Sequence, residues 1–222
     1  MTSIVAHRGA SGIALENSPA SIKAALALPV DAIEIDVRRT KDGELVLMHD
    51  PDTERVADGE LWVEEVSIDE LKKLKLKNGQ SIPTLNEVFK LVGDKKTLVL
   101  DIKSPGVAFG ILRLLKAHPK VKVFFSGRQY EELEKLHEAR PDIPFFVQHH
   151  YDPMEIIHRA TGMGAAGICL NMWLMNPATY HLALRQGLKV YVYSIDHRWL
   201  LKFFQKLYPE ANIISHHPER LL

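Results

Sequence analysis

The chain has 222 residues, 46% hydrophobic and 25% charged, and its 28 Lys and Arg balance its 28 Asp and Glu. This length fits one domain or two small ones with a large core, and the single Cys169 excludes an internal disulfide framework. The balanced charge argues against a nucleic-acid-binding protein. No apolar run reaches the roughly 18 residues of a transmembrane helix, and the first residues do not have the pattern of a signal peptide, so we expect a cytoplasmic protein.

Short apolar runs rich in Val, Ile and Phe recur along the chain and are too short for helices. Because they are apolar on both faces, they predict parallel strands that are covered on both sides. The eight runs are Ser3–Ala6, Ala32–Val37, Leu98–Ile102, Val121–Phe125, Pro144–Val147, Gly167–Leu170, Lys189–Ile195 and Asn212–Ile214.

Helix signals lie between these runs. Ser18-Pro19 is typical of an N-cap followed by proline at the first helical position. Capping boxes begin at Ser67 and Thr84, and Gly93 offers an end to the second of these helices. Apolar residues at helical spacing predict four more helices, over Glu131–Ala139, Pro153–Thr161, Pro177–Arg185 and Trp199–Leu207.

One connection breaks the alternation. Too few residues separate Val37 from Leu45 for a parallel crossover, which needs about a dozen. Because Asp42-Gly43 is also a favourable turn pair, Leu45–Met48 is predicted to return as an antiparallel strand. The remaining eight strands predict a single (β/α)8 barrel over residues 1–222, with a short β-hairpin excursion after the second strand. An open doubly wound sheet is the alternative, but the sequence has no Gly-rich phosphate loop.

Acidic residues occur within two of the predicted strands. Glu34 and Asp36 share one face of a strand with apolar neighbours, where two carboxylates repel each other unless a cation joins them or the face meets solvent. Asp101 and Lys103 end another strand, at the edge where barrel active sites lie. Asp101 is a candidate third ligand and Lys103 a candidate phosphate contact, unless they form a simple ion pair.

Two histidines complete the candidate site. His7 and Arg8 end the first strand and offer a proton-transfer group and a fork for oxyanions. A hairpin turn centred on Lys41-Asp42 would place His49 opposite Glu34, although a slip of one residue would turn it away. Hard oxygen ligands suit one Mg²⁺ or Ca²⁺ ion, and together with an acid, a base and two cations they predict metal-assisted phosphoryl chemistry on a small molecule.

The motifs in this order resemble the glycerophosphodiester phosphodiesterases. The resemblance is specific over nearly the first half of the chain and holds only in outline over the second. The matching stretches are His7–Gly12, Glu16-Asn17, Glu34–Val37, Thr40–Gly43, His49-Asp50, Ile82–Leu85 and Asp101–Lys103.

This resemblance implies a barrel enzyme that hydrolyses glycerophosphodiesters, such as glycerophosphocholine, to glycerol 3-phosphate and an alcohol. It implies His7 and His49 as the acid–base pair, without assigning the acid or the base. By position, the resemblance also implies Glu34, Asp36 and Asp101 as metal ligands and Arg8, Lys103 and Tyr193 as substrate contacts.

Five motifs depart from the family pattern. Glu16-Asn17-Ser18 stands where Glu-Asn-Thr is usual, which is a mild change. Asp101 stands where Glu is usual, Ser126-Gly127 where Ser-Phe is usual, Tyr193 where Trp is usual and Ser215-His216 where Thr-Asp is usual. The last three changes concern the alcohol side of the pocket, so they bear on substrate identity more than on reaction type. The change at the acidic end also makes His216 and His217 candidates for substrate contact.

Two other functions stay open at this point. A lysophospholipase D-like enzyme would need an apolar wall, for which Cys169–Met175 is a candidate. A phosphodiester-binding protein without catalysis is the other, although the intact histidines and acids argue against it.

Overall fold

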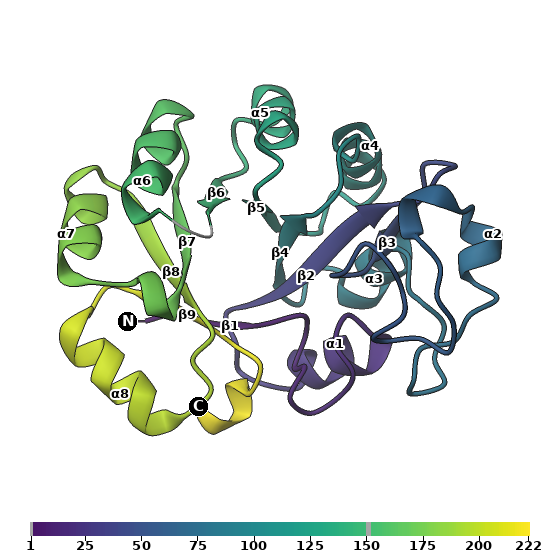
Figure 1. Cartoon of the computed structure of the whole chain (residues 1–222), viewed down its shortest axis with the longest axis horizontal. Helices are drawn as coiled ribbons and strands as arrows, with labels where there is room; N and C mark the ends of the chain where they lie inside the picture. The colour runs from purple at the N-terminus through teal and green to yellow at the C-terminus, as the bar shows by residue number, and fades with distance from the viewer. Residues whose placement is uncertain (1, 150–151) are drawn as a thin grey trace.

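Eight parallel strands close into a barrel in this computed structural model, which describes residues 2–149 and 152–222 (Figure 1). The barrel closes because β1 bonds to both β2 and β9. Its strands are β1 Ile4–Ala6, β2 Ala32–Arg39, β4 Thr97–Ile102, β5 Val123–Gly127, β6 Phe145–Gln148, β7 Gly167–Asn171, β8 Lys189–Tyr193 and β9 Asn212–Ser215. The predicted (β/α)8 barrel and all eight predicted strands are therefore confirmed.

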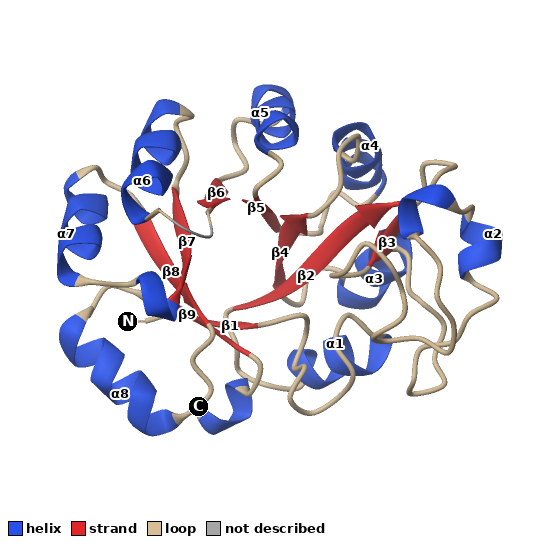
Figure 2. Cartoon of the chain, in the orientation of Figure 1, coloured by secondary structure: helices blue, strands red, loops and turns tan. Residues whose placement is uncertain are grey.

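Helices surround the barrel (Figure 2). They are α1 Pro19–Leu26, α2 Ile68–Leu71, α3 Leu85–Val92, α4 Ala108–Ala117, α5 Tyr130–Ala139, α6 Pro153–Gly162, α7 Pro177–Arg185 and α8 Arg198–Leu207. The three predicted caps form, at Ser18, Ser67 and Thr84. Sequence reasoning missed α4, because its N-cap is Val107, whose side chain makes no cap bond, and because it contains Gly110.

The hairpin forms as predicted, but in a different register. Strand β3 (Leu45–Leu47) pairs antiparallel with β2, with Val37 opposite Leu47 and Arg39 opposite Leu45. This centres the turn on Asp42 and shifts the pairing by one residue, so the expected pairing of Glu34 with His49 is wrong. The Thr40 hydroxyl fixes this turn, since it donates to the Asp42 carboxylate and accepts from the Glu44 backbone N–H.

The excursion is also larger than a hairpin. Between β3 and α3 the chain builds a small apolar cluster around Val56, Val63 and Leu71, which packs against Val46 of β3. From this segment, His49 reaches the cavity at the carboxyl ends of the strands.

Alternation along the strands sorts side chains into two environments. Outward residues such as Ile33, Ile35 and Leu100 belong to the core between barrel and helices. Inward residues such as Val99 and Cys169 pack inside the barrel. Two residues further along their strands, inward positions such as Glu34, Asp101 and Ser126 are polar, and they line a cavity together with Val99 and Cys169.

Candidate active site

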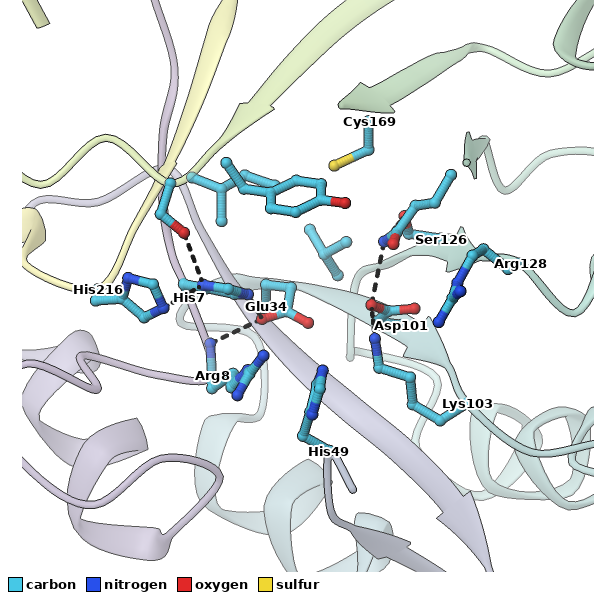
Figure 3. Close-up of a pocket in the computed structure, with 15 residues that line it drawn as sticks. His7, Arg8, Glu34, His49, Asp101, Lys103, Ser126, Arg128, Cys169 and His216 are labelled. Atoms are coloured by element: carbon cyan, nitrogen blue, oxygen red, sulfur yellow. Dashed lines mark hydrogen bonds and ion pairs between the residues drawn. The ribbon is translucent and has the colours of Figure 1, made fainter. Parts of the chain in front are cut away.

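A cavity of about 330 Å³ opens at the carboxyl ends of the barrel strands (Figure 3). Seven of the eight residues predicted for the site line it, and Asp36 lies fully buried beneath. The lining residues include His7, Arg8, Glu34, His49, Asp101, Lys103 and Tyr193. The structure therefore brings together every residue that the sequence singled out.

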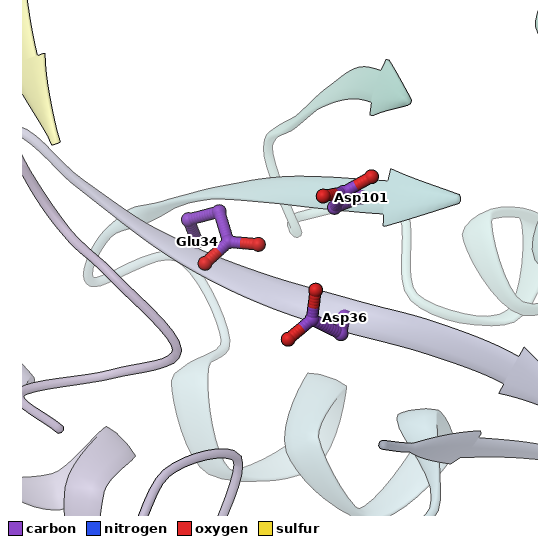
Figure 4. A group of neighbouring side chains, drawn as sticks. All are labelled: Glu34, Asp36 and Asp101. Atoms are coloured by element: carbon purple, nitrogen blue, oxygen red, sulfur yellow. The ribbon is translucent and has the colours of Figure 1, made fainter. Parts of the chain in front are cut away.

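Glu34, Asp36 and Asp101 form a buried triad, because Asp36 on β2 is paired with Asp101 on β4 (Figure 4). One oxygen of each carboxylate lies within 4.8 Å of the others. Glu34 Oε1 and Asp101 Oδ1 are buried without a hydrogen-bond partner among the described residues, and Asp36 Oδ1 has only an ion contact, 3.1 Å from Lys103 Nζ. Buried oxygens left without donors fit a hard divalent cation.

The first turn after β1 fixes two members of the triad. The Arg8 backbone N–H donates to Glu34 Oε2 at 2.7 Å, and Asn17 donates from Nδ2 to Asp36 Oδ2 at 2.7 Å while its Oδ1 accepts from the Asp36 backbone. Arg8 and Asn17 both have positive φ angles, 54° and 52°. These hydrogen bonds explain why two residues with Cβ atoms adopt a conformation that favours glycine.

Asp101 is held from the other side. Its Oδ2 accepts from Lys103 Nζ at 2.5 Å and from Gln148 Nε2 at 3.1 Å, and Gln148 also donates to Ser126 Oγ. A Cβ on Gly127 (φ 146°) would lie 2.9 Å from the Ile102 carbonyl oxygen and 3.2 Å from Asp101 Oδ1. Glycine therefore keeps the space beside the unpartnered oxygen open.

Burial and mutual repulsion govern the charges of the triad. Burial, followed by Asp36 and Asp101, raises the pKa of Glu34 well above its ordinary value. Burial alone would also raise the pKa of Asp36, but Lys103 and Arg8 outweigh it and hold that pKa well below its usual range. A cation between these groups would favour the ionised form of Glu34.

The two histidines face the triad from different segments. His7 Nε2 lies 3.8 Å from Glu34 Oε2, and burial, then the charge of Arg8, lower the pKa of His7 well below its ordinary value. His49 binds the Asp50 carboxylate through Nδ1 at 2.7 Å, and its carbonyl oxygen accepts two hydrogen bonds from Arg38. His49 therefore reaches the site from the loop after β3, without the predicted strand pairing.

Comparison with known proteins agrees with this geometry. The model of the glycerophosphoryl diester phosphodiesterase family matches residues 7–219. The chain belongs to this family. A glycerophosphodiester phosphodiesterase of Caldanaerobacter subterraneus subsp. tengcongensis is 31% identical, over 100% of this chain and 96% of that protein.

Solved structures show the same barrel. An Oleispira antarctica phosphodiesterase, in complex with the product sn-glycerol-3-phosphate, matches with a TM-score of 0.90 at 25% identity, over 100% of this chain and 95% of that chain. A putative glycerophosphodiester phosphodiesterase from Galdieria sulphuraria matches with a TM-score of 0.87 at 25% identity, over 100% of this chain and 96% of that chain. The protein is thus a phosphoric diester hydrolase, and the reading as a binding protein without catalysis is set aside.

An ion-pair chain joins the two sides of this phosphodiesterase's site. Arg8 NH1 donates to Glu16 at 2.9 Å, Arg55 donates to Glu16 at 2.6 Å and to Asp50 at 2.5 Å, and Asp50 holds His49. Sequence reasoning did not assign Asp50 or Arg55 a role. The position of Asp50 next to His49 in the sequence could have indicated its role, because one nitrogen of a histidine ring is commonly held by a carboxylate while the other acts.

Other functional residues of the phosphodiesterase escaped the sequence reasoning. Gln148 and Arg128 line the cavity, and Asn17 makes two hydrogen bonds to Asp36. Arg128 has no ion pair among the described residues, unlike Arg8 and Lys103. Among residues 2–149 and 152–222, no helix is long and apolar enough to cross a bilayer, and the cytoplasmic location stays a prediction.

Proposed function

We propose that the phosphodiesterase hydrolyses glycerophosphodiesters to glycerol 3-phosphate and an alcohol, with one Mg²⁺ or Ca²⁺ ion held by Glu34, Asp36 and Asp101. The observation that carries this proposal is the meeting of two imidazoles with two carboxylates in one cavity, directly above the buried Asp36. Both carboxylates in the cavity, Glu34 and Asp101, keep an unpartnered buried oxygen. The product bound in the Oleispira relative supports the choice of substrate.

Different side chains of the cavity stabilise charge and bind the substrate. When bound, the cation would withdraw charge from a phosphate oxygen. Arg8 and Lys103 lie beside the same space and stabilise the negative charge that develops on the phosphoryl group. The buried Tyr193 hydroxyl has no partner among the described residues, so it is free to donate to a substrate oxygen.

His7 and His49 move the protons. One imidazole takes the proton of the attacking hydroxyl as its oxygen bonds to phosphorus, and the other protonates the alcohol oxygen as its bond to phosphorus breaks. The attacking hydroxyl is either water or the substrate's own glycerol hydroxyl, which would give a cyclic phosphate that water then opens. Both routes end in the same products.

Phosphorus NMR of the reaction with glycerophosphocholine and glycerophosphoethanolamine tests this proposal. We expect glycerol 3-phosphate and the free alcohol, with a transient cyclic phosphate if the glycerol hydroxyl attacks. Phosphocholine or phosphoethanolamine with free glycerol would mean that the other ester bond breaks and would contradict the proposal.

A lysolipid is the second candidate substrate, and two exposed tryptophans favour it. Trp173 follows β7 in the short helix η2 (Met172–Leu174) and is 84% exposed, and Trp199 at the start of α8 is 68% exposed. Both follow the carboxyl ends of strands, on the side of the cavity. The predicted apolar wall Cys169–Met175 is smaller than expected, because Cys169, Leu170 and Met175 are buried.

Replacing Trp173 by Ala separates the two candidates. If acyl chains rest on Trp173, the variant loses turnover of lysophosphatidylcholine while turnover of glycerophosphocholine is unchanged. If wild-type protein turns over only the water-soluble diester, or the variant treats both substrates as wild type does, the lysolipid candidate is wrong.

A further inference from the structure

Hydrogen bonds connect three side chains at one side of the cavity, His7 and His216 in its lining and Asp196 outside it. Asp196, which follows β8, lies 3.0 Å through Oδ2 from His216 Nδ1, and His216 Nε2 lies 2.9 Å from His7 Nδ1 (Figure 3 labels both histidines). The two imidazole centroids are 4.4 Å apart at an interplanar angle of 48°. His216 follows β9 and lines the cavity itself. The line therefore runs from Asp196 to the half-buried ring of His7.

The hydrogen bonds give this line a direction. Asp196 Oδ1 accepts from Ser215 Oγ at 2.9 Å and from the His216 backbone N–H at 2.8 Å. Burial alone would raise the pKa of Asp196, but the bonds from His216 and Ser215 outweigh it and keep that pKa well below its usual range. An ionised carboxylate only accepts, so His216 donates from Nδ1.

The direction of donation in the first hydrogen bond also determines which nitrogen of His7 carries the proton. If His216 is neutral and donates from Nδ1, its Nε2 keeps a lone pair, which accepts a hydrogen bond from Nδ1 of His7. His7 then carries its proton on Nδ1 and has its lone pair on Nε2, the nitrogen that lies 3.8 Å from Glu34. Ser194 Oγ also faces His7 Nδ1, but at the longer distance of 3.4 Å.

We propose that Asp196 and His216 are positioning residues that fix the ring of His7, and that His216 is neutral, which keeps the His7 proton on Nδ1 so that Nε2 accepts the proton of the attacking hydroxyl. This rests on the proposed function for the acid–base role of His7, and it assigns the base to His7 and the acid to His49. His216 therefore acts through His7 and not as a substrate contact.

Asp196→Asn tests the direction of the line. In the wild type, Asp196 Oδ1 accepts two hydrogen bonds. In the variant, the amide oxygen of Asn takes the place of Oδ1, so the amide NH₂ group faces His216 Nδ1. His216 then accepts at Nδ1, donates from Nε2 to His7 Nδ1, and moves the His7 proton to Nε2. We expect kcat to fall by about 10²–10⁴, the usual contribution of a general base, with KM within about threefold. The matched control is Asp94→Asn, in an exposed turn, which should behave as wild type.

A double variant separates positioning from a structural role. In Asp196→Asn with His216→Ala the reversed donor is gone, so His7 regains a proton on Nδ1 by bonding water or Ser194. We expect the double variant to have a higher kcat than Asp196→Asn alone. Wild-type kcat in Asp196→Asn, or a double variant no better than the single one, would overturn the proposal.

Nitrogen NMR of histidine-labelled protein gives a readout that does not need turnover. The His7 signals should report a proton on Nδ1 in wild type and on Nε2 in Asp196→Asn, and an unchanged tautomer would overturn the proposal. If the wild-type protein shows the Nδ1 tautomer but does not turn over glycerophosphodiesters, the proposed function fails while the positioning of His7 stands.

Discussion

His7→Gln and His49→Gln are each expected to lower kcat by about 10²–10⁴, since each substitution removes a proton-transfer group from the cavity. The loss should fall on kcat more than on KM, because both rings serve the transition state. Initial rates of glycerol 3-phosphate release measure it. The double variant should lose less than the product of the two single losses, since the two groups act in one reaction.

The control for these variants is a histidine away from the cavity. His158→Gln changes an exposed residue of α6, so its kcat should equal that of wild type. If His7→Gln or His49→Gln keeps wild-type kcat with the native fold, the acid–base assignment is wrong.

Glu34→Gln is expected to stabilise the metal-free protein while it destroys activity. The amide oxygen of Gln still accepts the hydrogen bond from the Arg8 backbone, but the substitution removes a buried charge next to Asp36 and Asp101. Each unit by which the pKa of Glu34 is raised corresponds to about 1.4 kcal/mol against its ionised form, so the neutral amide should raise the melting temperature by several degrees. The loss in metal affinity should exceed the roughly 10–100-fold that outer-shell substitutions cause.

The gain in stability depends on pH with a definite sign. The pKa of Glu34 is higher in the folded protein than its value of 4.5 in the unfolded chain. As the pH rises above 4.5, the unfolded chain ionises first, so wild-type stability falls until the folded Glu34 also ionises. The advantage of Glu34→Gln should therefore be absent below pH 4.5 and largest at alkaline pH.

Thermal melts in EDTA and in saturating Ca²⁺ measure both effects. Wild type should gain stability from the ion, and Glu34→Gln should not. Glu131→Gln, at an exposed site on α5, should leave both the melting temperature and the ion response unchanged. A metal-free Glu34→Gln that melts below wild type at pH 8 would contradict the account of the triad.

Local sequence patterns determine most of the barrel and part of the site. Alternation along one strand is enough to put Glu34 and Asp36 on the same inward face, and the position of Asp101 at a strand end is enough to put it at the mouth. The hairpin register could not be predicted, because it depends on the Thr40 side chain bonding across the turn.

The supporting residues escaped because their partners are distant in sequence. Gln148 meets Asp101 across 47 positions, and His216 meets His7 across 209. No local pattern specifies such contacts, which appear only once the barrel brings the strand ends together. Asn17 belongs to one of the motifs that resemble the family, but its hydrogen bonds to Asp36 form only in the folded turn after β1.

Anomalous diffraction from crystals soaked in Mn²⁺, as a stand-in for Mg²⁺, or in Ca²⁺ tests the central claim most directly. One peak is expected, at coordination distance of about 2.1–2.6 Å from oxygens of Glu34, Asp36 and Asp101. A peak elsewhere, or an empty triad at ion concentrations that support turnover, would contradict it.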